Sequence, residues 1–250
     1  MRPKTIRAIR GTGWTFIWLG VYLLGFVAYQ LWFTNLLTAR EQSALAAGLD
    51  EHFAEVVVEE VEYEPVIPSG PSTTTTTVPD TGPPPPEPEP RILLQEAASE
   101  EGEAFAQIRI PAVDLDVTVV EGVRRRDLKK GPGHLPGTPL PGQPGNAVVS
   151  GHRTTYGAPF GDLGDLAIGD LIEVETALGT HVYAVREAPE RCRTDDGLCV
   201  VAPTDLWVTE PREGAWLTLT TCHPRFSSRQ RLIVFAELVS GPNAEVIVGA

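Results

Sequence analysis

Hydrophobic and polar residues follow three patterns along this 250-residue chain, and the first is an apolar run near the N-terminus. Residues 14–33 contain no charged side chain, and their aromatic residues cluster toward both ends of the run. A helix rising ~1.5 Å per residue crosses a hydrocarbon core of about 30 Å over this length. The pattern predicts an uncleaved transmembrane helix; a cleaved signal peptide, whose apolar run is shorter, is the alternative.

Charged residues on either side of this run indicate its orientation. Four basic residues lie within residues 1–13, whereas acidic residues dominate the chain after Arg40. Basic residues are retained on the cytoplasmic side of a membrane helix. We therefore expect a cytoplasmic N-terminus at 1–13, a single-pass anchor in the cell membrane, and an extracellular remainder.

The second pattern is a long stretch of biased composition. Residues 34–60 are rich in Ala, Leu and Glu and predict a helix outside the membrane. Residues 61–103 are dominated by Pro, Thr and Glu, a composition that cannot bury a core and predicts a disordered linker. Its most biased part, roughly 27 residues at ~3.1 Å each, would hold a following domain up to about 80 Å from the anchor.

The third pattern, over residues 104–240, consists of short alternating runs separated by Gly/Pro turns. This spacing is typical of an all-β sandwich or barrel with one core. The predicted strands are 105–110, 115–121, 146–150, 170–175, 181–187, 217–222 and 232–239. Short helical turns are expected at 125–130 and 160–163, a shaped loop at 131–146, and a C-terminal tail at 241–250.

The formal net charge of −13 comes mainly from the linker region. Residues 41–103 hold fifteen acidic side chains and one basic side chain, Arg91. A nucleic-acid-binding protein needs a basic surface to contact phosphates. The charge therefore argues against nucleic acid as a partner.

Three cysteines in an exported domain leave at least one unpaired. Cys192 and Cys199 bracket a short polar segment with an Asp-Asp-Gly turn signal, and they could form a disulfide in an oxidising compartment. Spacing alone does not show that their β-carbons meet, so the pairing stays open. If it forms, Cys222 is the unpaired thiol.

Three chemically competent residues lie at the ends of predicted strands. Cys222 ends one β-rich run, Arg231 opens the next, and His152 follows an upstream strand. Alternation puts Thr218 and Thr220 on the same face as Cys222, and we expect this face to be accessible. A thiol, an imidazole and a guanidinium are the parts of a thiol acyl-transfer site. Taken singly, each has an ordinary alternative as a buried small residue, a structural histidine or a surface charge.

The surrounding residues resemble the sortases, the transpeptidases that attach proteins to Gram-positive cell walls. The run ending at Cys222 (TLTTC) is similar to the sortase TLxTC signature, and RLIV from Arg231 resembles the family's arginine strand. GHRTTYGAPFGDL around His152 resembles the histidine region, and the loop KKGPGHLPGTPLPGQPGN resembles the class E sortases of high-GC Gram-positive bacteria. The resemblance covers roughly residues 104–239 and implies a sortase-type closed β-barrel of about 7–8 strands.

The resemblance also implies a reaction. Cys222 would be the nucleophile that forms an acyl-thioester, His152 the general acid or base, and Arg231 the group that stabilises the oxyanion and substrate. A sortase cleaves the Thr–Gly bond of an LAXTG or LPXTG-like sorting signal and transfers the secreted protein to an amine of a peptidoglycan precursor or a pilin. No cofactor and no metal is expected.

The substrate groove is expected beside the Cys222 strand. Its candidate lining residues are Leu135, Thr220 and Thr221. Leu135 departs from the class E pattern, in which we expect an aromatic residue after the histidine, and this departure could change the signal preference. His134 and His223 lie outside the family's histidine position. Arg229 is the nearby alternative to Arg231, but its place in a loop fixes its geometry less.

Two other functions account for the same features. A thiol hydrolase would use the same three residues and release a free acid. A non-catalytic wall-associated binding module would carry Cys222 in a buried, unreactive state. Product analysis distinguishes the hydrolase from a transpeptidase, and resistance of the native thiol to iodoacetamide would indicate the binding module.

Overall fold

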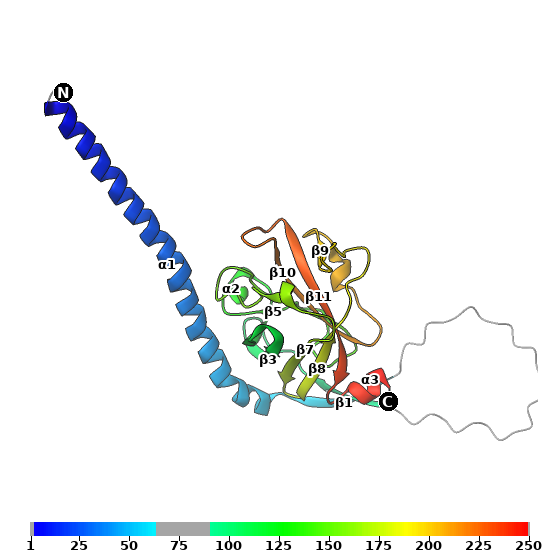
Figure 1. The fold of residues 1–250 in the computed structure, drawn as a ribbon. Helices are drawn as coiled ribbons and strands as arrows, with labels where there is room; N and C mark the ends of the chain where they lie inside the picture. Colours follow the sequence, from blue (N-terminus) through cyan, green and yellow to red (C-terminus); the bar gives the residue numbers. More distant parts are fainter. Residues whose placement is uncertain (1–2, 64–90, 250) are drawn as a thin grey trace, which may run out of the picture.

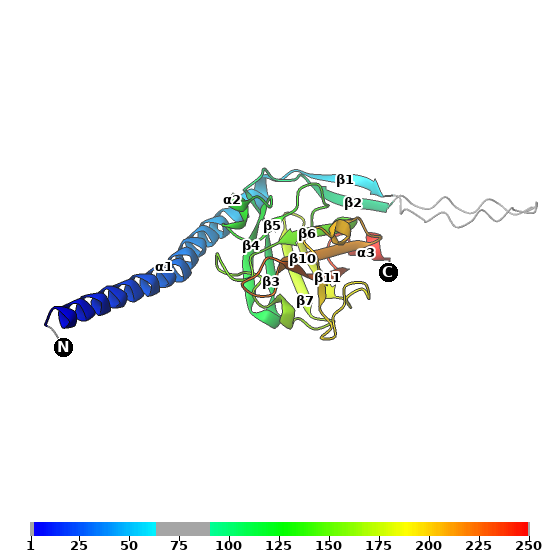
Figure 2. The same ribbon diagram turned by 90° about the horizontal axis from the view of Figure 1, so that it is seen from above.

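The computed structural model describes residues 3–63 and 91–249, and its first element is a single long helix, α1 (Pro3–Glu55) (Figure 1). The apolar run and most of the predicted helix at 34–60 therefore belong to one continuous element, whereas residues 58–60 lie in strand β1 (Val58–Tyr63). Within the described residues, one segment, Gly11–Tyr29, is apolar and long enough to cross a membrane. The C-terminal part of α1 lies against the barrel beside β3 and β4 (Figure 2).

Eight strands of the described part of the chain close into a barrel, in the order β10-β6-β5-β4-β3-β7-β8-β11, with β11 pairing back to β10. Strand β9 pairs with β11 outside this ring. The strands are β3 (Ala104–Ile110), β4 (Leu115–Glu121), β5 (Gly133–His134), β6 (Gly145–Ser150), β7 (Leu171–Thr176), β8 (Gly179–Val185), β9 (Cys199–Val201), β10 (Ala215–His223) and β11 (Gln230–Ser240). This architecture confirms the predicted all-β closed barrel.

Short helices connect the strands, and one packs where the sequence predicted only a tail. They are η1 (Pro111–Val113), α2 (Arg125–Leu128), η2 (Leu163–Asp165), η3 (Leu206–Thr209) and α3 (Ala244–Val248). Ala244 of α3 is buried against the barrel core. The folded domain therefore extends past residue 240.

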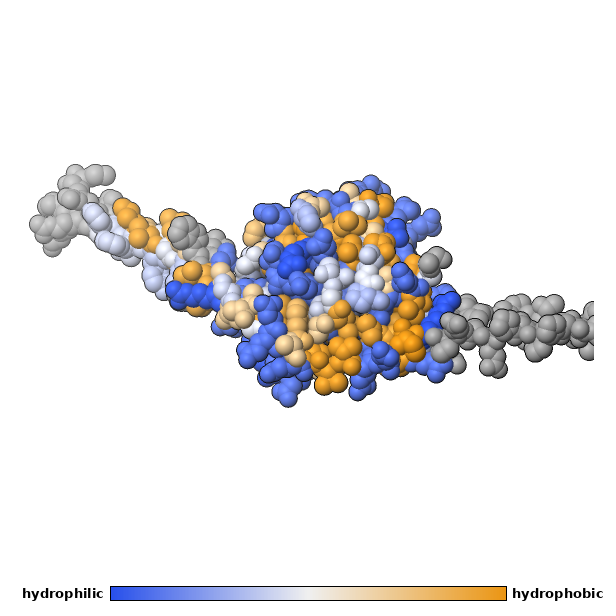
Figure 3. All heavy atoms as spheres, turned by 90° about the horizontal axis from the view of Figure 1, so that it is seen from below, coloured by the Kyte–Doolittle hydropathy of each residue, from blue (hydrophilic) through white to orange (hydrophobic). Residues whose placement is uncertain are grey.

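Apolar residues are buried on both faces of β10 and β11. Leu217 and Leu219 point into the barrel and are fully buried, as the alternation predicts. The chain between β8 and β10 covers the opposite face, where Cys192, Cys199, Val201 and Val208 form a second apolar cluster with Ile233 and Phe235 of β11. The prediction of an accessible face was therefore wrong at Thr218, which is fully buried and donates a hydrogen bond to Asn146 Oδ1 (2.6 Å). Figure 3 shows apolar and polar residues interspersed on the barrel surface seen from below.

The linker prediction was wrong at both ends of residues 61–103. β1 (Val58–Tyr63) and β2 (Arg91–Glu96) form an antiparallel pair in which Tyr63 lies opposite Arg91 (Figure 2). The biased residues 64–90 lie outside the described residues. Because their two flanking positions are paired, this segment does not set the distance between α1 and the barrel, contrary to the predicted stalk.

Polar side chains dock β2 onto the barrel near the C-terminal end of β11. Asn243 accepts a hydrogen bond from Leu94 N (2.9 Å) and donates one to Leu94 O (2.8 Å). Burial raises the pKa of the Glu96 carboxyl to about 7, and neither of its oxygens has a hydrogen-bond partner among the described residues. Burial lowers the pKa of nearby His181, which contacts Thr176 Oγ1 (3.3 Å), to about 4. β2 is thus anchored beside two buried groups that favour their neutral forms.

Candidate active site

Cys222 and Arg231 lie directly opposite each other at one end of the barrel. They are Cα partners in the antiparallel β10–β11 pair, and both are half-buried. Directly opposite residues on one face of a sheet have β-carbons about 4.5–5.5 Å apart. Cys222 carries a free thiol, whereas Cys192 and Cys199 form a disulfide. The strand pairing thus brings a thiol and a guanidinium to one surface.

The backbone beyond β6 follows β10 to the level of Cys222. Ser150 lies opposite Thr220 in the parallel β6–β10 pair. Gly151 N then donates to Thr220 O (3.0 Å), and Thr221 Oγ1 donates to Gly151 O (2.8 Å). Ser150 and Thr220 are the last paired residues of the two strands, and His152 and Cys222 each lie two residues beyond them.

Burial favours the neutral form of the His152 imidazole. Burial lowers its pKa from the ordinary value of 6.5. Its Nε2 is buried without a hydrogen-bond partner in the part of the chain that the structure describes. Its ring lies 4.9 Å from that of Tyr156, centroid to centroid, and its backbone oxygen accepts from Phe160 N (3.0 Å). A neutral imidazole with a free nitrogen is able to take up a proton.

Arg153 is a residue of this site that the sequence analysis missed. It is 9% exposed, and its Nη1 donates to His223 Nδ1 (2.7 Å) and weakly to Cys222 O (3.4 Å). Burial and the neighbouring Arg225 lower its pKa, but a guanidinium remains charged. The only signal in the sequence is its place directly after His152. Arg153 adds a fixed positive charge beside the nucleophile strand.

Arg231 is positioned by its own loop and by β9. Its Nη1 donates to Ser228 O and Gln230 O, both at 3.0 Å. Arg231 also lies opposite Val201 of β9, two residues after the disulfide-bonded Cys199. The Cys192–Cys199 disulfide, which the sequence alone did not decide, therefore holds β9 beside Arg231.

The three groove candidates have different surroundings. Thr220 is half-buried on the Cys222 face and remains a candidate. Thr221 is 2% exposed and its hydroxyl bonds the Gly151 carbonyl, so it supports the backbone before His152 and does not line a groove. Leu135 is half-buried, and its backbone N donates to Val148 O (2.8 Å). Val148 lies four residues before His152 along the chain, so Leu135 remains a candidate.

The residues set aside in the sequence have other partners. His134 is buried, with Nδ1 2.7 Å from Glu121 Oε2 and Nε2 3.0 Å from Pro139 O. Arg229 is exposed. His223 lies closer to the site than expected, because it shares the Arg153 guanidinium with the Cys222 carbonyl.

A family model described as the Sortase domain matches residues 108–239. Sortase SrtE1 of Streptomyces coelicolor is 29% identical over 247 residues, which cover 93% of this chain. This chain spans 57% of the length of that relative. The structure of sortase E from Streptomyces avermitilis is 37% identical, with a TM-score of 0.50, covering 58% of this chain and 93% of that one. The structure of Sortase E1 from Streptomyces coelicolor with a tripeptide in the active site is 32% identical, with the same score and coverages.

Proposed function

Because the chain belongs to the sortase family of cysteine transpeptidases, we propose that it cleaves the Thr–Gly bond of an LAXTG or LPXTG-like sorting signal and transfers the protein to a cell-wall amine. The observation that carries the proposal is the strand register. Cys222 lies opposite Arg231, and His152 follows β6 to the same level. The sortase E1 structure that holds a tripeptide in its active site supports a peptide substrate.

The first half of the reaction forms a thioester. The Cys222 thiol gives its proton to the neutral His152 imidazole, and the thiolate attacks the threonine carbonyl carbon. Arg231 stabilises the oxyanion, a contribution of about 2.7–4 kcal/mol by analogy with a single oxyanion donor. The C–N bond breaks, and the imidazolium gives its proton to the leaving glycine amine.

The second half reverses these steps with a different amine. The amine of a peptidoglycan precursor or a pilin attacks the thioester carbonyl, and its proton passes to His152. The C–S bond breaks and the Cys222 thiolate recovers the proton from the imidazolium. The products are an amide-linked protein and the free enzyme, and no cofactor enters the balance.

The barrel would work at the membrane surface in this proposal. Asn35 of α1 contacts Gly157 of the barrel (3.1 Å), only six residues after the apolar segment that ends at Tyr29. At ~1.5 Å per residue this separation is about 9 Å along the helix. We propose a single-pass protein with a cytoplasmic N-terminus and the catalytic domain outside, next to the lipid headgroups.

A peptide assay on the full chain in detergent micelles tests the proposal. Quenched LAXTG and LPXTG peptides are offered with and without an added amine of the oligoglycine or diaminopimelate type. Wild type should give the amide-linked product, and Cys222→Ala should give none. Free acid alone, even with excess amine, would identify a thiol hydrolase, and cleavage that survives Cys222→Ala would refute the mechanism.

A matched arginine pair tests the oxyanion role. Arg231→Lys should lower kcat about 100-fold, the usual effect of losing one oxyanion donor. Arg229→Lys, in the loop that precedes Arg231 and exposed, should leave kcat unchanged. Equal effects of the two substitutions would contradict the assignment of Arg231.

A further inference from the structure

The loop that follows His152 has an unfavourable backbone conformation. Tyr156, Gly157 and Ala158 have φ values of 52°, 77° and 47°. Left-handed backbone suits glycine, but for tyrosine and alanine it places Cβ too close to the following carbonyl oxygen. Such residues persist where the surrounding structure holds them, and they cluster at functional sites.

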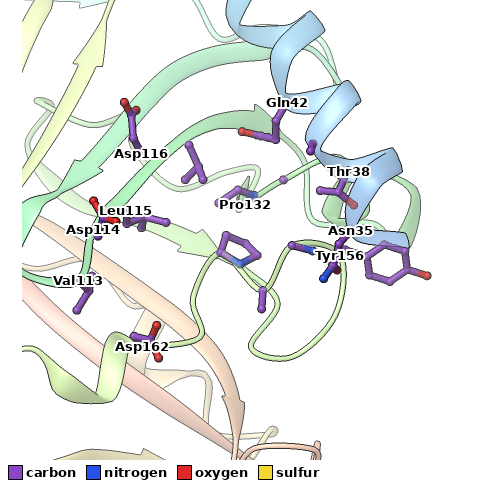
Figure 4. Close-up of a pocket in the computed structure, with 16 residues that line it drawn as sticks. Asn35, Thr38, Gln42, Val113, Asp114, Leu115, Asp116, Pro132, Tyr156 and Asp162 are labelled. Carbon is purple, nitrogen blue, oxygen red and sulfur yellow. Dashed lines mark hydrogen bonds between the residues drawn. The ribbon is translucent and has the colours of Figure 1, made fainter. Parts of the chain in front are cut away.

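Helix α1 supplies a contact at the centre of the loop. Asn35 Oδ1 accepts a hydrogen bond from Gly157 N (3.1 Å). A cavity of about 290 Å³ lies between α1, the β4 region and the loop (Figure 4). It is lined from the barrel side by residues such as Val113 and Leu115, and from the loop side by Tyr156 and Pro159. This cavity leaves a gap between the loop and the β4 side of the barrel.

The position of α1 on the barrel is itself fixed by hydrogen bonds. Gln42 Oε1 accepts from Thr118 N (2.8 Å), and Gln42 Nε2 donates to Thr118 O (3.0 Å) and Lys130 O (2.9 Å). Thr38 Oγ1 donates to Lys129 O (3.3 Å). Residues 35–42 thus connect β4 and the segment after α2 with the histidine loop.

The same loop delivers an aromatic ring to the imidazole. The Tyr156 ring centroid lies 4.9 Å from that of His152. Lys129 Nζ lies 5.7 Å from the Tyr156 ring centroid, from the segment that α1 also contacts. The contacts therefore run without a gap from α1 through Tyr156 to His152.

We propose that residues 35–42 of α1 are a positioning element of the active site, which holds the 156–158 loop so that Tyr156 fixes the His152 ring beside Cys222. The proposal rests on the proposed function only in taking His152 as the catalytic acid and base. Asn35 and Tyr156 act through His152 and are positioning residues. The anchor helix would thereby complete the catalytic machinery as well as tether it.

Substitutions at Asn35 in the full chain test the proposal, because this exposed helix position is not part of the barrel core. Asn35→Ala removes the acceptor for Gly157 N and should lower kcat at least tenfold with little change in KM, since a displacement of about 1 Å can cost 100-fold. Asn35→Asp keeps an oxygen acceptor and should restore kcat. Glu51→Ala, exposed on the same helix but outside residues 35–42, is the matched control and should behave as wild type.

A spectroscopic measurement makes the test independent of turnover. The Tyr156 ring should shift the NMR signals of the His152 ring protons; Tyr156→Phe should keep this shift, whereas Tyr156→Ala and Asn35→Ala should reduce it. Unchanged kcat and unchanged His152 signals in Asn35→Ala would overturn the positioning role while leaving the proposed function intact. If wild type cleaves no sorting peptide, the proposed function fails, and the His152 signals still decide whether α1 positions the ring.

Discussion

Replacing Glu96 by glutamine should change how the stability of this protein depends on pH. Glu96 is 7% exposed where β2 docks on the barrel, and burial raises its pKa from 4.5 to about 7. The nearby Thr176 hydroxyl and the backbone N–H groups of Ala177 and Leu178 lower the pKa by a smaller amount, although none of them meets the geometry of a hydrogen bond to Glu96. Glutamine has the same shape and stays neutral at every pH, so it removes the titration and keeps the packing.

The sign and size of the effect follow from linkage. The folded state favours the protonated carboxyl, so wild-type stability is fully present below pH 4.5 and is lost as the pH rises toward 7. At about 1.4 kcal/mol per pH unit, the interval corresponds to about 3 kcal/mol. The free energy of unfolding of Glu96→Gln minus that of wild type should therefore rise by about 3 kcal/mol between pH 4.5 and 7.5. A constant cost of burying the amide leaves this rise unchanged.

Urea unfolding of the full chain in detergent micelles, followed by tryptophan fluorescence, measures this difference. Titration of His181 lowers the free energy of unfolding in the opposite direction, as the pH falls from 6.5 toward 4. Because both proteins carry His181, this contribution cancels in the difference between them. Glu59→Gln, on the exposed strand β1, is the matched control and should show no rise. A difference between Glu96→Gln and wild type that stays flat across this range would refute the argument.

Three further predictions concern the catalytic end of the barrel. Replacing Cys192 and Cys199 by serine should lower the free energy of unfolding by about 2–3 kcal/mol, the loop-closure value for this short separation. Thermal melts with and without reductant measure this effect, and a wild-type midpoint that does not change with reductant would contradict it. Thr221→Val leaves a buried carbonyl without its donor, should cost about 1–3 kcal/mol and should lower kcat; Thr218→Val, equally buried in the same strand, should lower stability without lowering kcat. Arg153→Gln should slow iodoacetamide modification of the Cys222 thiol at neutral pH, and an unchanged rate would show that this guanidinium does not act on the thiol.

The sequence predicted the parts of the fold that depend on local alternation. Leu217 and Leu219 are inside the barrel because a period of two settles which side chains share a face. It does not settle what covers the other face. Thr218 was predicted to be accessible and is fully buried. Its hydroxyl donates to Asn146, which in turn donates to two backbone carbonyls of the excursion between β8 and β10, Val208 O and Glu210 O. Burial by a segment distant in sequence leaves no trace in the strand itself.

In the candidate site, too, the sequence predicted the residues at strand ends and missed those whose place depends on an irregular loop. Cys222 and Arg231 end and begin neighbouring runs, and a tight antiparallel connection brings such residues opposite each other. Arg153 and Tyr156 were missed because their roles depend on a non-repetitive loop. The left-handed backbone at Tyr156, a conformation uncommon for such a residue, directs its ring to His152, and a helix more than a hundred residues upstream holds that loop.

Because β1 pairs with β2, the segment between these two strands does not act as a spacer between α1 and the barrel. Residues 64–90 begin and end at neighbouring positions of one small sheet, because Tyr63 lies opposite Arg91. Doubling the number of residues between two fixed chain positions costs only about 0.6 kcal/mol of chain entropy. Insertions, deletions or a reporter domain at this point should therefore leave both α1 and the barrel undisturbed, which makes it a suitable place to label the protein in living cells.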